Sequence, residues 1–260
     1  MNEGEKMSFT EEKREWIKKY MLEKIRQDDG AYAQKTMENF EVSITTVKRY
    51  LKECVEQKII VPNADKECGY CLITVEEEWE VDDVEDLEED TFYFDKVFPI
   101  LNDLSENSRK IWYYAFTEMM NNAIEHAKAK RICCKVKKDV LYTEISIADD
   151  GIGIFNSIRQ YADQQLHIKM DTAQARMELY KGKFTTSPES HSGEGIFFTS
   201  KMLAQFALWS EDVMYSNRCD DEAKFVRSHL IAYYTKLNRI GTMVQMKLEN
   251  DTKRTAREVF

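Results

Sequence analysis

The stretch TEMMNNAIEHA, residues 117–127, carries side chains that could hold a metal ion and activate a nucleophile. A helix over this stretch places Glu118, Asn121, Asn122 and Glu125 on one face and the apolar residues on the other. Mg²⁺ takes hard oxygen ligands, few of them from protein, so one amide oxygen with a nearby carboxylate suits it. Simple exposure of this polar face to solvent is the alternative interpretation.

A second stretch, IADDGIGI (residues 147–154), could bind a flat ligand at the end of a strand. The alternating pattern before it predicts a strand that ends at Asp149. A carboxylate there can accept a hydrogen bond from an exocyclic amine. Gly151 and Gly153 permit tight backbone geometry and close approach of the ligand. A β-turn with two glycines is the alternative.

A third stretch, SGEGIFFTSKMLAQF (residues 192–206), places Gly193 and Gly195 just before a predicted helix. A glycine-rich turn that leads into a helix exposes backbone N–H groups, which can bind phosphate. An ordinary glycine-rich loop with a helix cap is the alternative here.

In this order and spacing, the three stretches resemble the GHKL domain shared by gyrase, the MutL mismatch-repair proteins, histidine kinases and anti-sigma-factor kinases. The first looks like its N-box, the second like its G1 box and the third like its G2 box. Residues 240–244 (IGTMV) look like its closing G-T-x-V strand. The resemblance covers residues 92–250. It implies an α+β fold, a two-layer α/β sandwich of the GHKL (Bergerat) type, that binds ATP with Mg²⁺.

The resemblance also implies a role for individual residues. Glu118 matches the acidic residue that acts as the general base, and Asn122 matches the asparagine that binds Mg²⁺. Asp149 matches the aspartate that accepts a hydrogen bond from the adenine amine. These three residues argue against a vestigial nucleotide site.

The remaining matches lie near the base or the phosphates. Gly151 and Gly153 match the turn beneath the adenine, and Thr242 matches a threonine close to it. Gly193 and Gly195 match the phosphate-side glycines at the hinge of the ATP lid.

Residues 155–192 match the lid itself, which is the most variable part of such domains. Lys183, Thr185 and Thr186 are the candidates for phosphate contacts there. They are equally compatible with a solvent-facing loop.

Residues 1–75 are predicted to form a separate small domain. Ser8 and Glu11 form a capping-box pattern for its first helix. Three helices followed by a hairpin resemble a winged helix-turn-helix. The expected helices are 8–27, 31–40 and 43–57, and the expected strands are 59–62 and 70–73.

The helix 43–57 would then be the recognition helix for duplex DNA. Its candidate contacts are Thr45, Thr46, Lys48, Arg49 and Lys52. A dimerisation or partner-docking module remains the alternative, because the segment is close to neutral rather than basic.

The other expected elements follow an acidic block. Residues 76–91 are nearly all acidic or apolar, which indicates an exposed face or an acidic linker. Helices are expected at 94–104, 105–129 and from 194, a hairpin at 131–148, helical patches within 151–192, and strands at 206–210, 227–234 and 242–248. The tail 251–260 resembles the junction to a STAS-like domain.

Composition indicates the cellular compartment of the protein. The chain has 260 residues, six cysteines and a net charge of −10, without a secretory signal or a membrane-spanning run. These features predict a cytoplasmic protein with no membrane partner. Cys68 and Cys71 form a C-x-x-C pair that we interpret as plain thiols, because no second pair follows at zinc spacing.

The leading hypothesis is a regulatory protein that hydrolyses ATP or transfers its phosphoryl group to a protein serine or threonine, as anti-sigma-factor kinases do. Residues 1–90 contain no histidine, so a self-phosphorylating histidine kinase is not expected. The alternative is a DNA-binding transcriptional regulator that uses ATP as an allosteric ligand without turnover. A homodimer is left open.

Overall fold

The computed structural model describes residues 3–181, 195–217 and 222–255. Its contacts divide the chain into two units. The first comprises the residues up to Val75 together with Asp139–Leu141, and the second comprises Glu76–Lys138 and the residues from Tyr142 onward.

The first unit has the three helices and the hairpin expected from the sequence. Its elements are α1 (Glu3–Arg26), α2 (Tyr32–Phe40), α3 (Ile44–Glu56), β1 (Ile60–Pro62) and β2 (Tyr70–Leu72). The strands β1 and β2 pair antiparallel. The predicted start of the first helix at Ser8 was wrong, because α1 already begins at Glu3.

The helix α3 is fixed by its cap and by one buried face. The side-chain oxygen of Ser43 accepts a hydrogen bond from the backbone N–H of Thr46 at 3.3 Å, as expected of an N-cap. The buried side chains recur at helical spacing and include Val47, Leu51 and Cys54. The opposite face of α3 is therefore left to solvent.

Neither Cys68 nor Cys71 of the C-x-x-C pair forms a disulfide. Cys68 is buried, and its Sγ lies 3.1 Å from the carbonyl oxygen of Tyr70. Burial raises the pKa of this thiol.

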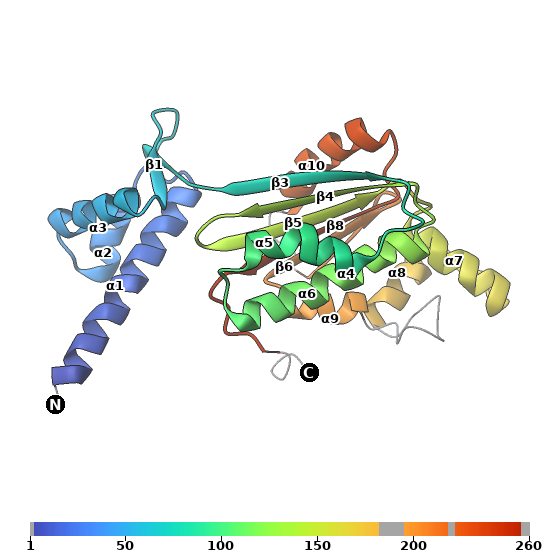
Figure 1. The fold of residues 1–260 in the computed structure, drawn as a ribbon, viewed down its shortest axis with the longest axis horizontal. Helices are drawn as coiled ribbons and strands as arrows, with labels where there is room; N and C mark the ends of the chain where they lie inside the picture. The colour runs from blue at the N-terminus through green and yellow to red at the C-terminus, as the bar shows by residue number, and fades with distance from the viewer. Residues whose placement is uncertain (1–2, 182–194, 218–221, 256–260) are drawn as a thin grey trace. The chain divides into compact units, whose positions relative to one another are not determined.

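The second unit is built on a six-stranded sheet in the order β3-β4-β5-β8-β6-β7 (Figure 1). Each neighbouring pair from β4 to β7 is antiparallel. The strands are β3 (Val75–Asp82), β4 (Arg131–Lys138), β5 (Tyr142–Asp149), β6 (Gln205–Ser210), β7 (Val213–Ser216) and β8 (Thr242–Glu249). The hairpin predicted at 131–148 is confirmed as β4 and β5.

Helices cover one face of this sheet and form the main core with it (Figure 1). They are α4 (Glu89–Phe92), the π-helix η1 (Tyr93–Val97), α5 (Phe98–Leu101), α6 (Glu106–Asn121), the π-helix η2 (Asn122–His126) and α9 (Gly195–Met202). The helices α7 (Ile154–Gln165) and α8 (Thr172–Lys181) add side chains to the same core, and α7 extends past the end of the sheet (Figure 1). Trp112 and Phe116 of α6 pack with Ile145 and Ile147 of β5 in that core. The expected α+β sandwich of helices on a sheet is confirmed at this level.

The predicted strand at 227–234 is wrong, because these residues lie in the helix α10 (Glu222–Leu237). Its side chains Leu230, Tyr233 and Leu237 are spaced three and four residues apart, so they share one helical face. They pack with Cys133, Ala148 and Met243, which belong to a cluster separate from the main core. The helix α10 therefore covers the second face of the sheet (Figure 1).

The acidic block 76–91 is not a linker, because its first half is the edge strand β3. Trp79 and Val81 alternate with its glutamates and pack against the main core. The glutamates on the other face are paired with lysines: Glu76–Lys135 at 2.6 Å, Glu78–Lys236 at 2.9 Å and Glu80–Lys236 at 3.1 Å. These pairs offset the self-repulsion that led to the prediction of a linker.

The segment after β8 packs on the second unit rather than leaving it. The amide nitrogen of Asn107 donates to the carbonyl oxygen of Arg254 at 2.9 Å. The Ser108 hydroxyl donates to the backbone carbonyl oxygen of Asn250 at 3.0 Å. Thr252 is buried. Residues 250–255 are thus tied to the start of α6.

Candidate functional site

The helix α6 carries the first set of predicted site residues. It begins after Ser105, whose side-chain oxygen accepts from the backbone N–H of Ser108 at 3.1 Å. Near its end, Met119 and Met120 are buried in the core, and Glu118 and Asn122 are half-buried. The amphipathic helix expected over residues 117–127 is confirmed.

The helix changes from α to π geometry at Asn122. The Asn122 amide nitrogen donates to the carbonyl oxygen of Glu118 at 2.8 Å. This bond turns the nitrogen toward the helix backbone, so the Asn122 Oδ1 is the atom that can ligate a cation. An amide oxygen of this kind fits the hard-ligand chemistry of Mg²⁺. Short π segments are frequent at functional sites.

Asp149 ends β5 and is buried, with 3% of its surface exposed. By the alternation of a strand, it lies on the same side of the sheet as Ile145 and Ile147, the side covered by α6. Its Oδ1 accepts from the backbone N–H of Gly151 at 2.8 Å and of Thr242 at 3.3 Å. Because both bonds go to Oδ1, Oδ2 is the oxygen that can receive a ligand donor.

Burial raises the pKa of Asp149 to about 7, because a carboxylate removed from water loses its hydration. The two backbone donors act in the opposite direction, and so does the positive charge of Arg239. The neighbouring carboxylate of Asp150 raises the pKa further. A strongly perturbed buried acid marks a candidate functional site when its geometry also suits a ligand.

Three glycines near the end of β5 lie where a side chain would be crowded or strained. A Cβ on Gly151 would lie 2.8 Å from the carbonyl carbon of Ala127, and one on Gly241 would lie 2.5 Å from Asp149 Oδ1. Gly153 has φ +89°, a conformation that favours glycine. The turn Gly151–Gly153, which we call the G1-like turn, is thus packed against Ala127 at the end of η2 on one side and against Gly241 before β8 on the other.

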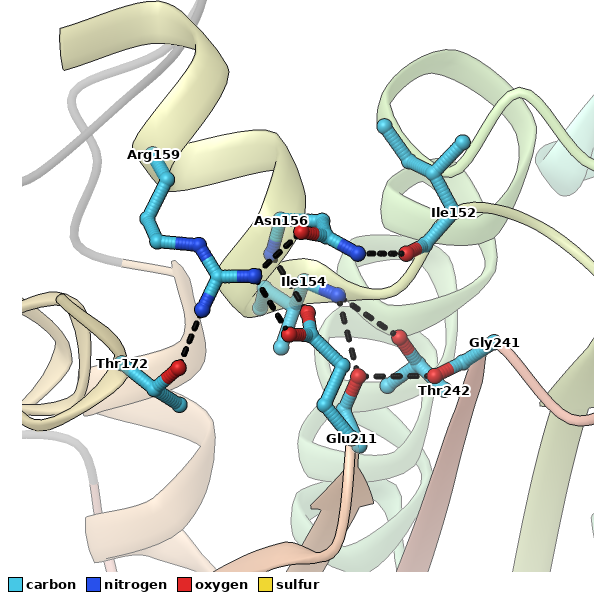
Figure 2. A network of polar contacts seen from close by, with 9 residues as sticks. Ile152, Ile154, Asn156, Arg159, Thr172, Glu211, Gly241 and Thr242 are labelled. Atoms are coloured by element: carbon cyan, nitrogen blue, oxygen red, sulfur yellow. Dashed lines mark hydrogen bonds and ion pairs between the residues drawn. The ribbon is translucent and has the colours of Figure 1, made fainter. Parts of the chain in front are cut away.

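Thr242 lies in the same cluster as Asp149. Its Oγ1 accepts from the backbone N–H of Ile154 at 3.1 Å, and the Oγ of Ser210 accepts from the same N–H at 3.2 Å (Figure 2). The Ser210 hydroxyl donates to the carbonyl oxygen of Gly241 at 2.7 Å. The start of α7 is therefore bonded to the ends of β6 and β8.

Gly195 lies directly against the general-base candidate. A Cβ at Gly195 would collide with the Glu118 carboxylate and would lie 2.8 Å from its Cδ. The structure thus brings together Glu118 from α6 and the first residue of α9. Residues far apart in the sequence therefore meet at this point.

The predicted site residues that the structure describes fall into two groups. Asp149, Gly151, Gly153 and Thr242 form one cluster, and Glu118, Asn122 and Gly195 lie along or against α6. The remaining predicted site residues lie outside the described residues: Lys183, Thr185, Thr186 and Gly193.

Sequence reasoning missed a polar network beside the G1-like turn. The carboxylate of Glu211 accepts from the backbone N–H of Asn156 at 2.6 Å and pairs with Arg159 at 2.7 Å (Figure 2). Arg159 also bonds Asn156 and Thr172. In the sequence, the polar residues Ser-Glu-Asp at 210–212 lie between two apolar strands, and this pattern could have indicated a tight hairpin there.

No protein-family model matches the chain, and no curated protein matches it in sequence. Within residues 3–181, 195–217 and 222–255, none of the helices has the length and apolar character needed to cross a bilayer. Over the same ranges, no group of three or more His, Cys, Asp and Glu side chains is arranged to hold a metal ion.

Proposed function

We propose that residues 92–250 form a GHKL-type domain that binds ATP with Mg²⁺. The observation that carries the proposal is Asp149, a buried carboxylate at a strand end whose Oδ1 is held by two backbone donors. The other oxygen then accepts from the adenine amine. Gly151 packs against Ala127 and Gly241 packs against Asp149, at positions where a Cβ would not fit. This close packing supports the proposal because it holds the carboxylate in one place at the strand end.

The metal and the phosphates would lie beside α6. The Oδ1 of Asn122 is oriented away from the helix backbone by the bond from its Nδ2 to Glu118. Bound with the nucleotide, Mg²⁺ would neutralise phosphate charge there. Glu118, one helical turn before Asn122 and in contact with Gly195, is then close to the γ-phosphate.

In the proposed reaction, Glu118 accepts the proton of a water molecule or of a serine or threonine hydroxyl. The oxygen of that group forms a bond to the γ-phosphorus, while the bond from the γ-phosphorus to the β–γ bridging oxygen breaks. ADP leaves with the electron pair of the broken bond. General-base assistance of this kind contributes about a hundred- to ten-thousand-fold in rate.

The test measures binding and turnover separately. Calorimetry with ATP, ADP and GTP should give binding of both adenine nucleotides and much weaker binding of GTP, because guanine has a carbonyl oxygen where adenine has the amine. Incubation with ATP labelled at the γ-phosphate should release phosphate or label a protein partner. Equal affinity for GTP would refute the assignment of Asp149.

A DNA-binding function of the first unit is the second candidate, and the exposed face of α3 favours it. Thr45, Lys48, Arg49 and Lys52 are exposed, while Val47 on the other face is buried. Lys48, Arg49 and Lys52 thus lie on the exposed face of α3, which would be the recognition helix of a helix-turn-helix. Cations on this face suit contacts with the phosphates and bases of DNA. Electrophoretic shifts of duplex DNA should weaken as salt rises; no shift at low salt would favour a protein-docking module.

A further inference from the structure

The hairpin between β6 and β7 is made of two residues with unfavourable backbone conformations. Glu211 and Asp212 have φ +52° and +63°. Two-residue hairpins with positive φ at both positions are usually built from asparagine, aspartate and glycine. A glutamate in this conformation is strained, so its side chain is a candidate for a role that offsets the strain.

The Glu211 side chain supplies a cap to a helix that has none of its own. Residue Gly153 occupies the N-cap position of α7 and has no side chain with which to cap it. Glu211 Oε1 accepts instead from the backbone N–H of Asn156 at 2.6 Å (Figure 2). A carboxylate at a helix N-terminus satisfies a free donor and interacts favourably with the helix dipole.

The same carboxylate is held in place by Arg159. The guanidinium of Arg159 lies 2.7 Å from Glu211 Oε2 and also bonds the side chains of Asn156 and Thr172. The Arg159 and Glu211 side chains retain only 26% and 21% of their exposure. Glu211 is therefore fixed on both oxygens, one by the start of α7 and one by the second turn of that helix.

This cap lies next to the turn that we assign to the adenine. A Cβ on Gly153 would lie 3.1 Å from Glu211 Oε1 and 2.7 Å from Ser210 Oγ. Gly153 is two residues after Gly151, whose N–H bonds Asp149. The position of the hairpin thus determines where the G1-like turn can lie.

We propose that Glu211 is a positioning residue for nucleotide binding, which acts by holding the Gly151–Gly153 turn through the cap on α7. The proposal rests on the proposed ATP-binding function. It does not require Glu211 to touch the nucleotide.

The test compares two glycine substitutions in the same hairpin. Glu211→Gly relieves backbone strain and removes the cap, whereas Asp212→Gly relieves strain at an exposed position and leaves the cap intact. ATP and ADP affinities should both fall by about 3- to 30-fold in Glu211→Gly, the range expected for loss of a helix cap. Asp212→Gly should bind like the parent, and Glu211→Gln should recover part of the loss, because its amide oxygen can still accept from Asn156.

The experiment distinguishes failure of the positioning role from failure of the proposed ATP-binding function. Thermal unfolding checks that Glu211→Gly remains folded, and amide exchange at Ile154 and Asn156 should be faster in it than in Asp212→Gly. If the parent binds ATP and Glu211→Gly binds it equally well, the positioning role is overturned while the ATP site stands. If the parent itself binds no ATP, the proposed function is refuted first. A fall in ATP affinity without a fall in ADP affinity would also contradict a role at the adenine turn.

Discussion

Replacing Asp149 by asparagine should make the protein more stable and at the same time weaken its binding of adenine nucleotides. Asparagine has nearly the same shape and keeps an oxygen to accept from the N–H groups of Gly151 and Thr242. Its NH₂ group then takes the place of Oδ2 and points hydrogen-bond donors at the donor of adenine. The loss of a hydrogen bond to a charged group predicts an affinity lower by about 10- to 150-fold.

The gain in stability follows from the raised pKa of Asp149. The carboxyl has a pKa of about 7 in the folded protein, against an ordinary value of 3.8. Between these values the folded state binds a proton that the unfolded state does not, so raising the pH in this window lowers the free energy of unfolding. The full difference corresponds to roughly 4 kcal/mol, an upper limit that is reached above pH 7.

Urea denaturation of the parent and Asp149→Asn at pH 5, 7 and 8.5 measures the effect. The variant should exceed the parent by about a third of the full effect at pH 5, where the unfolded parent is already ionised at this carboxyl, and by nearly all of it at pH 7 and 8.5. Parallel stability curves across this range would refute the reasoning, because they would show that the pKa of Asp149 is the same in the folded and the unfolded protein. Unchanged affinity for ATP in the variant would remove Asp149 from the binding site.

Further predictions concern α6, the first residue of α9 and the first unit. Glu118→Gln should bind ATP like the parent but lose turnover by about a hundred- to ten-thousand-fold, measured by release or transfer of labelled phosphate. Asn122→Ala should weaken ATP binding in the presence of Mg²⁺ more than in its absence, measured by calorimetry. Gly195→Ala should reduce both binding and turnover, because its Cβ collides with the Glu118 carboxylate; unchanged kinetics would contradict that contact. Lys48→Ala combined with Arg49→Ala should weaken DNA binding and flatten its salt dependence, measured by gel shifts.

Local patterns in the sequence predicted the elements that carry the site. Ser43 capped a helix as expected, and the period of two in residues 140–148 gave a strand ending at Asp149. The helix over 117–127 followed from a polar face with Glu118 and Asn122 opposite Met119 and Met120. These features depend on residues close in sequence, so pattern and spacing were sufficient.

Features that depend on distant residues were missed. The block 76–91 looked like a linker because its charges repel one another, and their partners Lys135 and Lys236 lie elsewhere in the sequence. Residues 227–234 looked like a strand because they are rich in apolar and aromatic types. The helical spacing of Leu230, Tyr233 and Leu237 gains meaning only from the sheet face that it covers.

The role of Glu211 also depends on residues that are distant in the sequence. Nothing in the sequence near position 211 indicates a helix cap, because the N–H that it accepts from is 55 residues earlier. The positive φ of Glu211, which indicates backbone strain, is a property of the folded hairpin.

The π turn at Asn122–His126 has a consequence for how this chain can vary in length. A π turn contains one residue more than an α-helical turn of the same span, so removing one residue there would restore α geometry. Because the π turn takes up its extra residue within one turn, the residues after such a deletion would keep their orientation about the helix axis. The carbonyl oxygen of Ala127, which accepts from the N–H of Ile152 at 2.8 Å, could then still face that residue. Loss of one residue within the π turn should therefore disturb this contact less than the same loss within α6, where every following residue would rotate by about 100°.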